Sequence, residues 1–179
     1  EAGSPDLVLC DTETLSTLPA NEWENGMAEL IKYAAIRDAT LYDAAKSADP
    51  QGMIARCVEI KRDVVQSDEH DRGERQILNF GHTVGHAIEK LSAYSVPHGR
   101  AVAAGMAIIA RGCVRLKLCG EDCLSPLIRA LRASNLPETS EYAEDALFSA
   151  MLSDKKRAAD RIALVIPESP GHCRLLDAS

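Results

Sequence analysis

Five polar side chains recur at helical spacing in one short stretch of the chain: Arg75, Asn79, His82, His86 and Glu89. If residues 75–89 form a helix, these side chains share one narrow stripe, because residues three and four apart are neighbours on a helix surface. A guanidinium, an amide and two imidazoles presented together could hold a metal ion and an anion. The alternative is an ordinary solvated face, although such faces normally carry lysine and glutamate rather than the poorer helix formers asparagine and histidine.

The other side of this predicted helix is apolar, so the segment should have one buried face. That side consists of Ile77, Phe80, Val84, Ala87 and Ile88. Gly81 and Gly85 lie between these residues and leave room for another backbone to approach closely. We therefore expect one continuous amphipathic helix that packs against a core and presents the polar stripe on its other side.

Four of the five histidines fall between positions 70 and 98, which suggests a metal site. A catalytic zinc commonly has three protein ligands, often two histidines and one glutamate, and keeps a fourth position open. The nitrogen candidates are His82, His86 and His98, and the oxygen candidates are Glu29, Glu69, Asp71 and Glu89. Spacing alone does not choose among them. Thr83 stands where the His-Glu-x-x-His motif of metalloproteases has its general base, so hydrolysis is not the first expectation.

Several cations could surround an anionic substrate, because phosphate and carboxylate groups are bound by charged forks or point charges. The candidates are Lys32, Lys61, Arg75, Lys155 and Lys156. Each lysine taken alone is more often an ordinary surface residue. Only their convergence on one cleft would make them a binding site.

Composition bounds the fold and the partners. A chain of 179 residues with 46% hydrophobic content is long enough for one well-cored domain, which we expect to span residues 1–179. The net charge of −7 argues against non-specific binding to nucleic acid or to an anionic membrane surface. The longest apolar run, residues 101–110, is too short to span a bilayer, and no signal peptide is visible, so we expect a cytoplasmic location.

The six cysteines show no Cys-x-x-Cys pair, and we expect reduced, mostly buried thiols. The nearest approach to a metal pattern among them is Cys113, Cys119 and Cys123. Their spacings match no common zinc template, so a cysteine site is not expected.

The pattern of elements predicts a mainly α fold with a short strand at residues 6–10 and a small β-hairpin at the C-terminal end. A strand that begins a chain needs a partner, which suggests that a preceding piece of the protein is missing. The hairpin should pair residues 162–166 with 173–176 around Pro170 and Gly171. Helices are expected from Asn21, with Glu24 completing a capping box, then over 38–48, 50–66, 75–93, 98–117, 127–133 after Ser125 and Pro126, and 140–153. No glycine-rich nucleotide turn is present.

Five motifs, in the same order across most of the chain, resemble the C-terminal, largely helical domain of the 3-dehydroquinate synthase family of the shikimate pathway, within the sugar-phosphate cyclase superfamily. The motifs are Asn25-Gly26-Met27-Ala28-Glu29-Leu30-Ile31-Lys32-Tyr33, Glu59-Ile60-Lys61, residues 75–89, His98-Gly99 with residues 101–106, and Asp154-Lys155-Lys156. The family's N-terminal NAD-binding domain has no counterpart in this sequence.

The resemblance implies a role for each matching residue. Glu29, His82 and His98 would bind zinc, or cobalt in its place. His86 and Asp71 would transfer protons, and Lys32 would contact the substrate as part of the catalytic group. Lys61, Arg75, Asn79 and one of Lys155 and Lys156 would bind the substrate, 3-deoxy-arabino-heptulosonate 7-phosphate. NAD would be bound mainly by the missing domain, and the full-length enzyme is expected to be a homodimer.

In this family NAD acts catalytically: the sugar is oxidised, phosphate is eliminated, the ketone is reduced again, and the ring opens and closes by an aldol step. Zinc suits this chemistry because it polarises hydroxyl and carbonyl oxygens. Two alternatives remain, a sibling cyclase that acts on another phosphorylated sugar and a non-catalytic helical remnant of the same fold. Retention of Asn79 and His86 favours the shikimate enzyme over a sibling.

Three positions depart from the family's pattern. Arg100 replaces the glutamate that usually follows His-Gly, so a carboxylate beside a metal ligand would be replaced by a positive charge. Asp71 stands where the family carries a longer glutamate, and the residues after Lys156 lack an expected glycine. Arg100 is the strongest support for the non-catalytic alternative.

Overall fold

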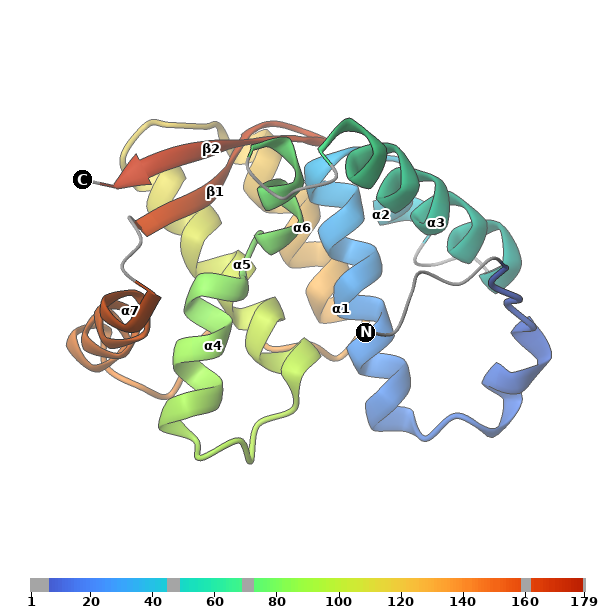
Figure 1. The fold of residues 1–179 in the computed structure, drawn as a ribbon, viewed down its shortest axis with the longest axis horizontal. Helices are drawn as coiled ribbons and strands as arrows, with labels where there is room; N and C mark the ends of the chain where they lie inside the picture. Colours follow the sequence, from blue (N-terminus) through green and yellow to red (C-terminus); the bar gives the residue numbers. More distant parts are fainter. Residues whose placement is uncertain (1–6, 45–48, 69–72, 159–161, 179) are drawn as a thin grey trace.

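The computed structural model describes residues 7–44, 49–68, 73–158 and 162–178, and confirms the mainly helical fold (Figure 1). Its elements are η1 (Thr12–Thr17), α1 (Ala20–Ile36), α2 (Leu41–Ala44), α3 (Pro50–Ser67), η2 (Glu74–Asn79), α4 (His82–Leu91), α5 (His98–Arg115), α6 (Glu121–Ala133), α7 (Glu144–Ala158), β1 (Ile162–Ser169) and β2 (His172–Ala178). Every helix within these ranges is too short or too polar to cross a membrane.

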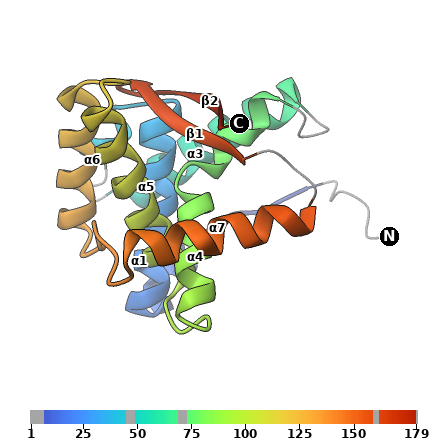
Figure 2. The same ribbon diagram turned by 90° about the vertical axis from the view of Figure 1, so that its left-hand side faces the viewer.

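Helix α5 contributes to both hydrophobic clusters of the fold. Val102 and Met106 are fully buried in the larger cluster with residues of α1 and α6, such as Ile31 and Leu131. A smaller cluster joins α5 to α4 and to α7, which crosses α4 in Figure 2. It consists of Val84, Ala87, Ile88, Ala101, Ala104, Leu147 and Ala150. The small side chains of α5 allow neighbouring helices to approach its backbone on several sides.

The expected continuous helix over residues 75–89 is wrong, because the segment is divided in two. Residues 74–79 form the 3-10 helix η2, Phe80 follows with an extended backbone, and Gly81 has a φ of +82°. A side chain on Gly81 would meet the Val102 carbonyl oxygen at 2.7 Å, and one on Gly105 would collide with the Gly81 carbonyl oxygen. The break therefore lies where the chain makes its closest approach to α5, at a position that requires glycine.

The expected C-terminal hairpin is confirmed. Strands β1 and β2 pair antiparallel, with Leu164 opposite Leu176 and Val165 opposite Leu175. Gly171, with a φ of +73°, makes the turn between them. Val165 is buried in the larger hydrophobic cluster, so one face of the hairpin packs against the helices.

Three local expectations fail. Residues 7–10 form no strand, and Leu7, Val8 and Leu9 are 74%, 68% and 86% exposed, since no neighbouring strand pairs with them in the described part of the chain. Helix α1 is preceded by Pro19, so Asn21 does not cap it. Helix α6 begins at Glu121, with Pro126 inside the helix. Glu121 and Asp122 supply favourable negative charge in its first turn, four residues before the start expected from Ser125 and Pro126.

Candidate metal and substrate site

Three histidine rings meet where α4 and α5 begin. His82 is the first residue of α4, His86 lies one turn later, and His98 is the first residue of α5. The ring centroids are 5.2 Å apart for His82 and His98, 5.6 Å for His82 and His86, and 6.2 Å for His86 and His98. The close packing of Gly81 on Gly105 brings the start of α4 beside α5, and so places the rings together.

Glu29 from α1 completes the group. Among the residues that the structure describes, one potential ligand atom from each of Glu29, His82 and His98 lies within 4.8 Å of the other two. A second such group is made of His86, Glu89 and His98. Both groups contain His98, so the distances alone leave two alternative ligand sets for one metal ion.

The environment of Glu29 favours the first group. Its Oε2 accepts a hydrogen bond from the Lys32 ammonium at 2.6 Å. Its Oε1 is buried, has no hydrogen-bond partner and lies 3.9 Å from His82 Nε2. A buried carboxylate oxygen without a partner is costly, and a cation between it and the imidazoles would satisfy it. Two nitrogens and one carboxylate are a donor set that zinc accepts.

His82 presents a neutral nitrogen to this oxygen. Burial and, after it, the neighbouring Lys32 charge lower the pKa of His82 to about 4. Its Nδ1 lies 3.3 Å from the Phe80 carbonyl oxygen. If Nδ1 carries the proton and donates it to that carbonyl, the lone pair of Nε2 faces Glu29. This is the form of imidazole that binds metals.

His98 is held by a carboxylate from α4. Its Nδ1 lies 3.1 Å from Glu89 Oε1, and the Glu89 side chain is only 14% exposed. Arg100 turns away toward Glu24, with its Nη1 at 2.7 Å from Oε2. His98 therefore keeps a carboxylate neighbour although position 100 carries an arginine, because Glu89 supplies one.

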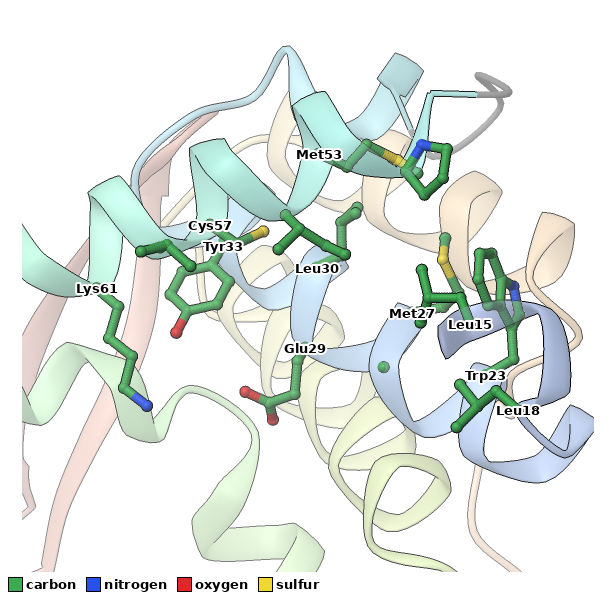
Figure 3. A pocket seen from close by; sticks show the side chains of 14 residues that line it. Leu15, Leu18, Trp23, Met27, Glu29, Leu30, Tyr33, Met53, Cys57 and Lys61 are labelled. Atoms are coloured by element: carbon green, nitrogen blue, oxygen red, sulfur yellow. The ribbon is translucent and has the colours of Figure 1, made fainter. Parts of the chain in front are cut away.

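A largely apolar groove lies between η1, α1 and α3, and we call it the α1–α3 groove (Figure 3). It has a volume of about 240 Å³ and is lined mainly by Leu15, Leu18, Trp23, Met27, Leu30, Tyr33, Met53, Ile54 and Val58. Glu29 and Lys61 lie at one end of the groove. The exposed Lys61 side chain points to the same side of the groove as the Glu29 carboxylate. The groove is therefore apolar along most of its length and carries two charged side chains, Glu29 and Lys61, at one end.

Sequence comparisons identify the family of this chain. The profile of the family described as "3-dehydroquinate synthase C-terminal" matches residues 26–157. The chain belongs to this family. It is 40% identical over 184 aligned residues to the 3-dehydroquinate synthase of Dehalococcoides mccartyi, and 41% identical over 180 to that of a Shewanella species. These alignments cover 97% and 93% of the chain, but only 51% and 50% of the two relatives. The chain thus spans about half the length of the curated relatives it matches.

Solved structures share the fold. A 2-epi-5-epi-valiolone synthase from Streptomyces hygroscopicus with NAD+ and Zn2+ bound superposes with a TM-score of 0.83 at 22% identity, over 94% of this chain and 51% of that one. A 2-deoxy-scyllo-inosose synthase complexed with carbaglucose-6-phosphate, NAD+ and Co2+ gives 0.75 at 23% identity, over 94% of this chain and 52% of that one. At these identities the likeness establishes the fold of a 3-dehydroquinate synthase C-terminal domain and no more.

The remaining residues expected in the site are placed as follows. Arg75 and Asn79 lie on η2, directly before α4, and the Arg75 N–H donates to Asp68 Oδ2. Asp71 lies outside the described residues. Lys155 and Lys156 lie near the end of α7, and their side chains are likewise outside the described part. The cysteines contribute no metal group among the described residues, and all six are free thiols.

Sequence reasoning missed one set of residues beside the site. Asn25 accepts a hydrogen bond from the Gly99 N–H at 3.0 Å, and Glu24 pairs with Arg100 at 2.7 Å. These partners are more than seventy residues apart, so no local spacing reveals them. The sequence signals here are the unusual charge of Arg100 and the presence of Asn25 and Gly99 in the family-like motifs, neither of which shows that the two segments touch.

Proposed function

We propose that this chain is the metal- and substrate-binding half of a 3-dehydroquinate synthase, which converts 3-deoxy-arabino-heptulosonate 7-phosphate to 3-dehydroquinate with loss of phosphate. The observation that carries the proposal is the meeting of Glu29, His82 and His98 from three helices, with an unpartnered carboxylate oxygen among them. Membership of the family and 40% identity to curated enzymes of that name support it over a sibling cyclase, since the solved cyclases are 22% and 23% identical.

Glu29, His82 and His98 would hold a divalent cation, zinc or cobalt, as the solved cyclases do with Zn2+ or Co2+. Such a cation polarises the oxygens of a bound hydroxyl or ketone. Lys32 orients the Glu29 carboxylate through its 2.6 Å contact. Glu89 holds His98 through Nδ1, so that the other ring nitrogen remains available.

The substrate is an anionic sugar acid, and this chain offers cations to bind it. Lys32 is 4% exposed and Lys61 is exposed at the end of the α1–α3 groove, so both can contact a ligand beside Glu29. Arg75, Asn79 and one of Lys155 and Lys156 are proposed for its phosphate and carboxylate groups. Lys32 would contact the substrate deep in the site, and Lys61 would contact it nearer the surface.

His86 is proposed to move protons. Its ring is exposed and lies 5.6 Å from the His82 ring, so it can exchange protons with solvent while touching the edge of the site. Imidazole takes and releases protons readily near neutral pH. Asp71 is proposed to assist it, as the family resemblance implies.

NAD accepts a hydride and returns it, and we propose that a second domain of the same enzyme binds it. The curated relatives are about twice as long as the matched region, and this sequence carries no glycine-rich nucleotide turn. The α1–α3 groove and the exposed Leu7, Val8 and Leu9 give that domain an apolar surface to cover.

Metal titration tests the proposal directly. The purified chain should bind one Zn2+, and His82→Ala should lower the affinity by more than about 100-fold, since even outer partners of metal ligands matter by 10–100-fold. His172→Ala, at the exposed first residue of β2, is the matched control and should bind like wild type. Supplied with NAD, Zn2+ and substrate, the chain alone should form no dehydroquinate. Unaltered zinc binding by His82→Ala would refute the site, and turnover by the chain alone would refute the need for a second domain.

A further inference from the structure

Helices α1 and α5 touch backbone to backbone directly beside the proposed metal site. The Gly99 N–H donates to Asn25 Oδ1 at 3.0 Å, and a side chain on Gly99 would lie 2.5 Å from the Asn25 Cα atom. Only glycine permits this approach. The contact fixes how deeply the first turn of α5 sits against α1.

A charged network surrounds this contact. Arg100 Nη1 lies 2.7 Å from Glu24 Oε2 and donates to the Asn135 carbonyl oxygen at 3.0 Å. The Asn135 amide donates to Glu24 Oε1 at 2.8 Å. Both oxygens of Glu24 are therefore satisfied, one by each partner. Because Asn135 follows α6, the network ties α1, α5 and the end of α6 together.

The network joins the same two helices, α1 and α5, that carry the proposed metal ligands Glu29 and His98. His98 is two residues before Arg100, and Glu29 is five residues after Glu24, which corresponds to about 7.5 Å along a helix. Any sliding or rotation of α1 against α5 changes the separation of Glu29 and His98. Metal ligands need to be held within a fraction of an ångström of the right geometry.

We propose that Glu24 and Arg100 are positioning residues for the metal site, because their ion pair sets the offset between α1 and α5 that lets Glu29 and His98 reach one cation. This inference rests on the proposed function. It also gives the unusual residue at position 100 a role in this chain: Arg100 acts through Glu24 on the helix that carries Glu29, while Glu89 holds His98.

The test compares zinc affinity and the visible absorption of the Co2+ form in four variants. Glu24→Ala and Arg100→Ala should each weaken zinc binding about 10-fold and alter the Co2+ spectrum, since outer partners of a metal site contribute about 10–100-fold. The double variant should be no weaker than either single one, because both changes break the same contact. Arg100→Lys keeps the charge and should keep most of the affinity.

The matched control is the ion pair of Arg56 and Asp38. It has the same 2.7 Å length, and its side chains are 43% and 17% exposed, against 35% and 20% for Arg100 and Glu24. Arg56→Ala should therefore cost similar stability in urea but leave zinc affinity and the Co2+ spectrum unchanged.

The outcomes are separable. If wild type binds zinc and both alanine variants bind it equally well with an unchanged Co2+ spectrum, the positioning role is overturned and the proposed function stands. If Arg56→Ala weakens zinc binding as much as Arg100→Ala does, the effect is general destabilisation, and the positioning role is again overturned. If wild type binds no zinc, both proposals fail. Should an alanine variant not fold, Arg100→Gln and Glu24→Gln, which remove the charges while keeping polar side chains of similar length, supply the same comparison.

Discussion

Lys32 Nζ lies 2.6 Å from Glu29 Oε2, while the other oxygen of that carboxylate has no hydrogen-bond partner. One side of the Glu29 carboxylate is therefore neutralised by the protein, and the other is left for a ligand. Lys32 is 4% exposed, so its ammonium and the carboxylate depend on each other for compensation.

Lys32→Met should destabilise the metal-free chain by about 1–3 kcal/mol, less than for a fully buried pair because the Glu29 side chain is partly exposed. Saturating Zn2+ should narrow the difference from wild type, because a cation at Oε1 compensates the same carboxylate. Urea unfolding with and without Zn2+ measures both effects. Lys61→Met, at an exposed lysine, is the control and should change stability by no more than about 0.5 kcal/mol.

Glu89→Gln should lower zinc affinity about 10-fold, since the charged partner of His98 Nδ1 is lost. Glu168→Gln changes a comparable but exposed glutamate beside His172 and should have no effect on zinc affinity.

His86→Ala distinguishes the two possible ligand groups: it should keep zinc binding if Glu29, His82 and His98 are the ligands. Loss of zinc in His86→Ala, together with zinc binding retained in His82→Ala, would instead favour the group of His86, Glu89 and His98.

Gly81→Ala should cost at least about 2 kcal/mol of folding stability. The residue has a φ of +82°, and a methyl group would meet the Met106 side chain at 2.5 Å and the Val102 carbonyl oxygen at 2.7 Å. Gly112→Ala is the control. Gly112 lies in α5, and nothing is within 4 Å of a methyl group added there. This substitution should instead stabilise the chain by about 0.5–1 kcal/mol. Equal effects of the two substitutions in urea unfolding would contradict this account of the break before α4.

Thiol reactivity should distinguish the cysteines. Burial raises the pKa of Cys57 and of Cys123 to about 11, and raises that of Cys173 as well. At pH 8 these groups stay almost wholly as thiols, and the thiolate is the reactive form. An aromatic disulfide reagent at pH 8 should therefore label the exposed Cys10 first and the other three only slowly, until urea exposes them. Rapid labelling of Cys173 in the folded chain would contradict its burial.

Local patterns predicted much of the fold. The helix expected over residues 50–66 is α3 (Pro50–Ser67), and the turn at Gly171 between two apolar runs defines the hairpin. The polar stripe correctly singled out His82, His86 and Glu89, which share α4. It could not reveal the break at Gly81, because that backbone conformation is imposed by contact with α5 rather than by neighbouring residues.

The parts of the site that sequence reasoning left open depend on contacts between distant segments. Spacing offered four carboxylates for one metal position, and only packing of α1 on α5 brings Glu29 to the histidines. The partner of Arg100 was equally hidden, since Glu24 lies on another helix. The failed strand at residues 7–10 shows the same limit: an apolar run predicts burial, but a strand exists only when another strand pairs with it.

The ligands proposed for the cation come from α1, α4 and α5, and none of these helices supplies more than one of them. Only the folded chain brings the three ligands together, so a bound ion would link the three helices and stabilise the folded state. At a free zinc concentration one hundred times the dissociation constant, mass action would add about 2.7 kcal/mol to the free energy of unfolding. Removal of the ion by a chelator would therefore lower the free energy of unfolding as well as remove the group proposed for catalysis.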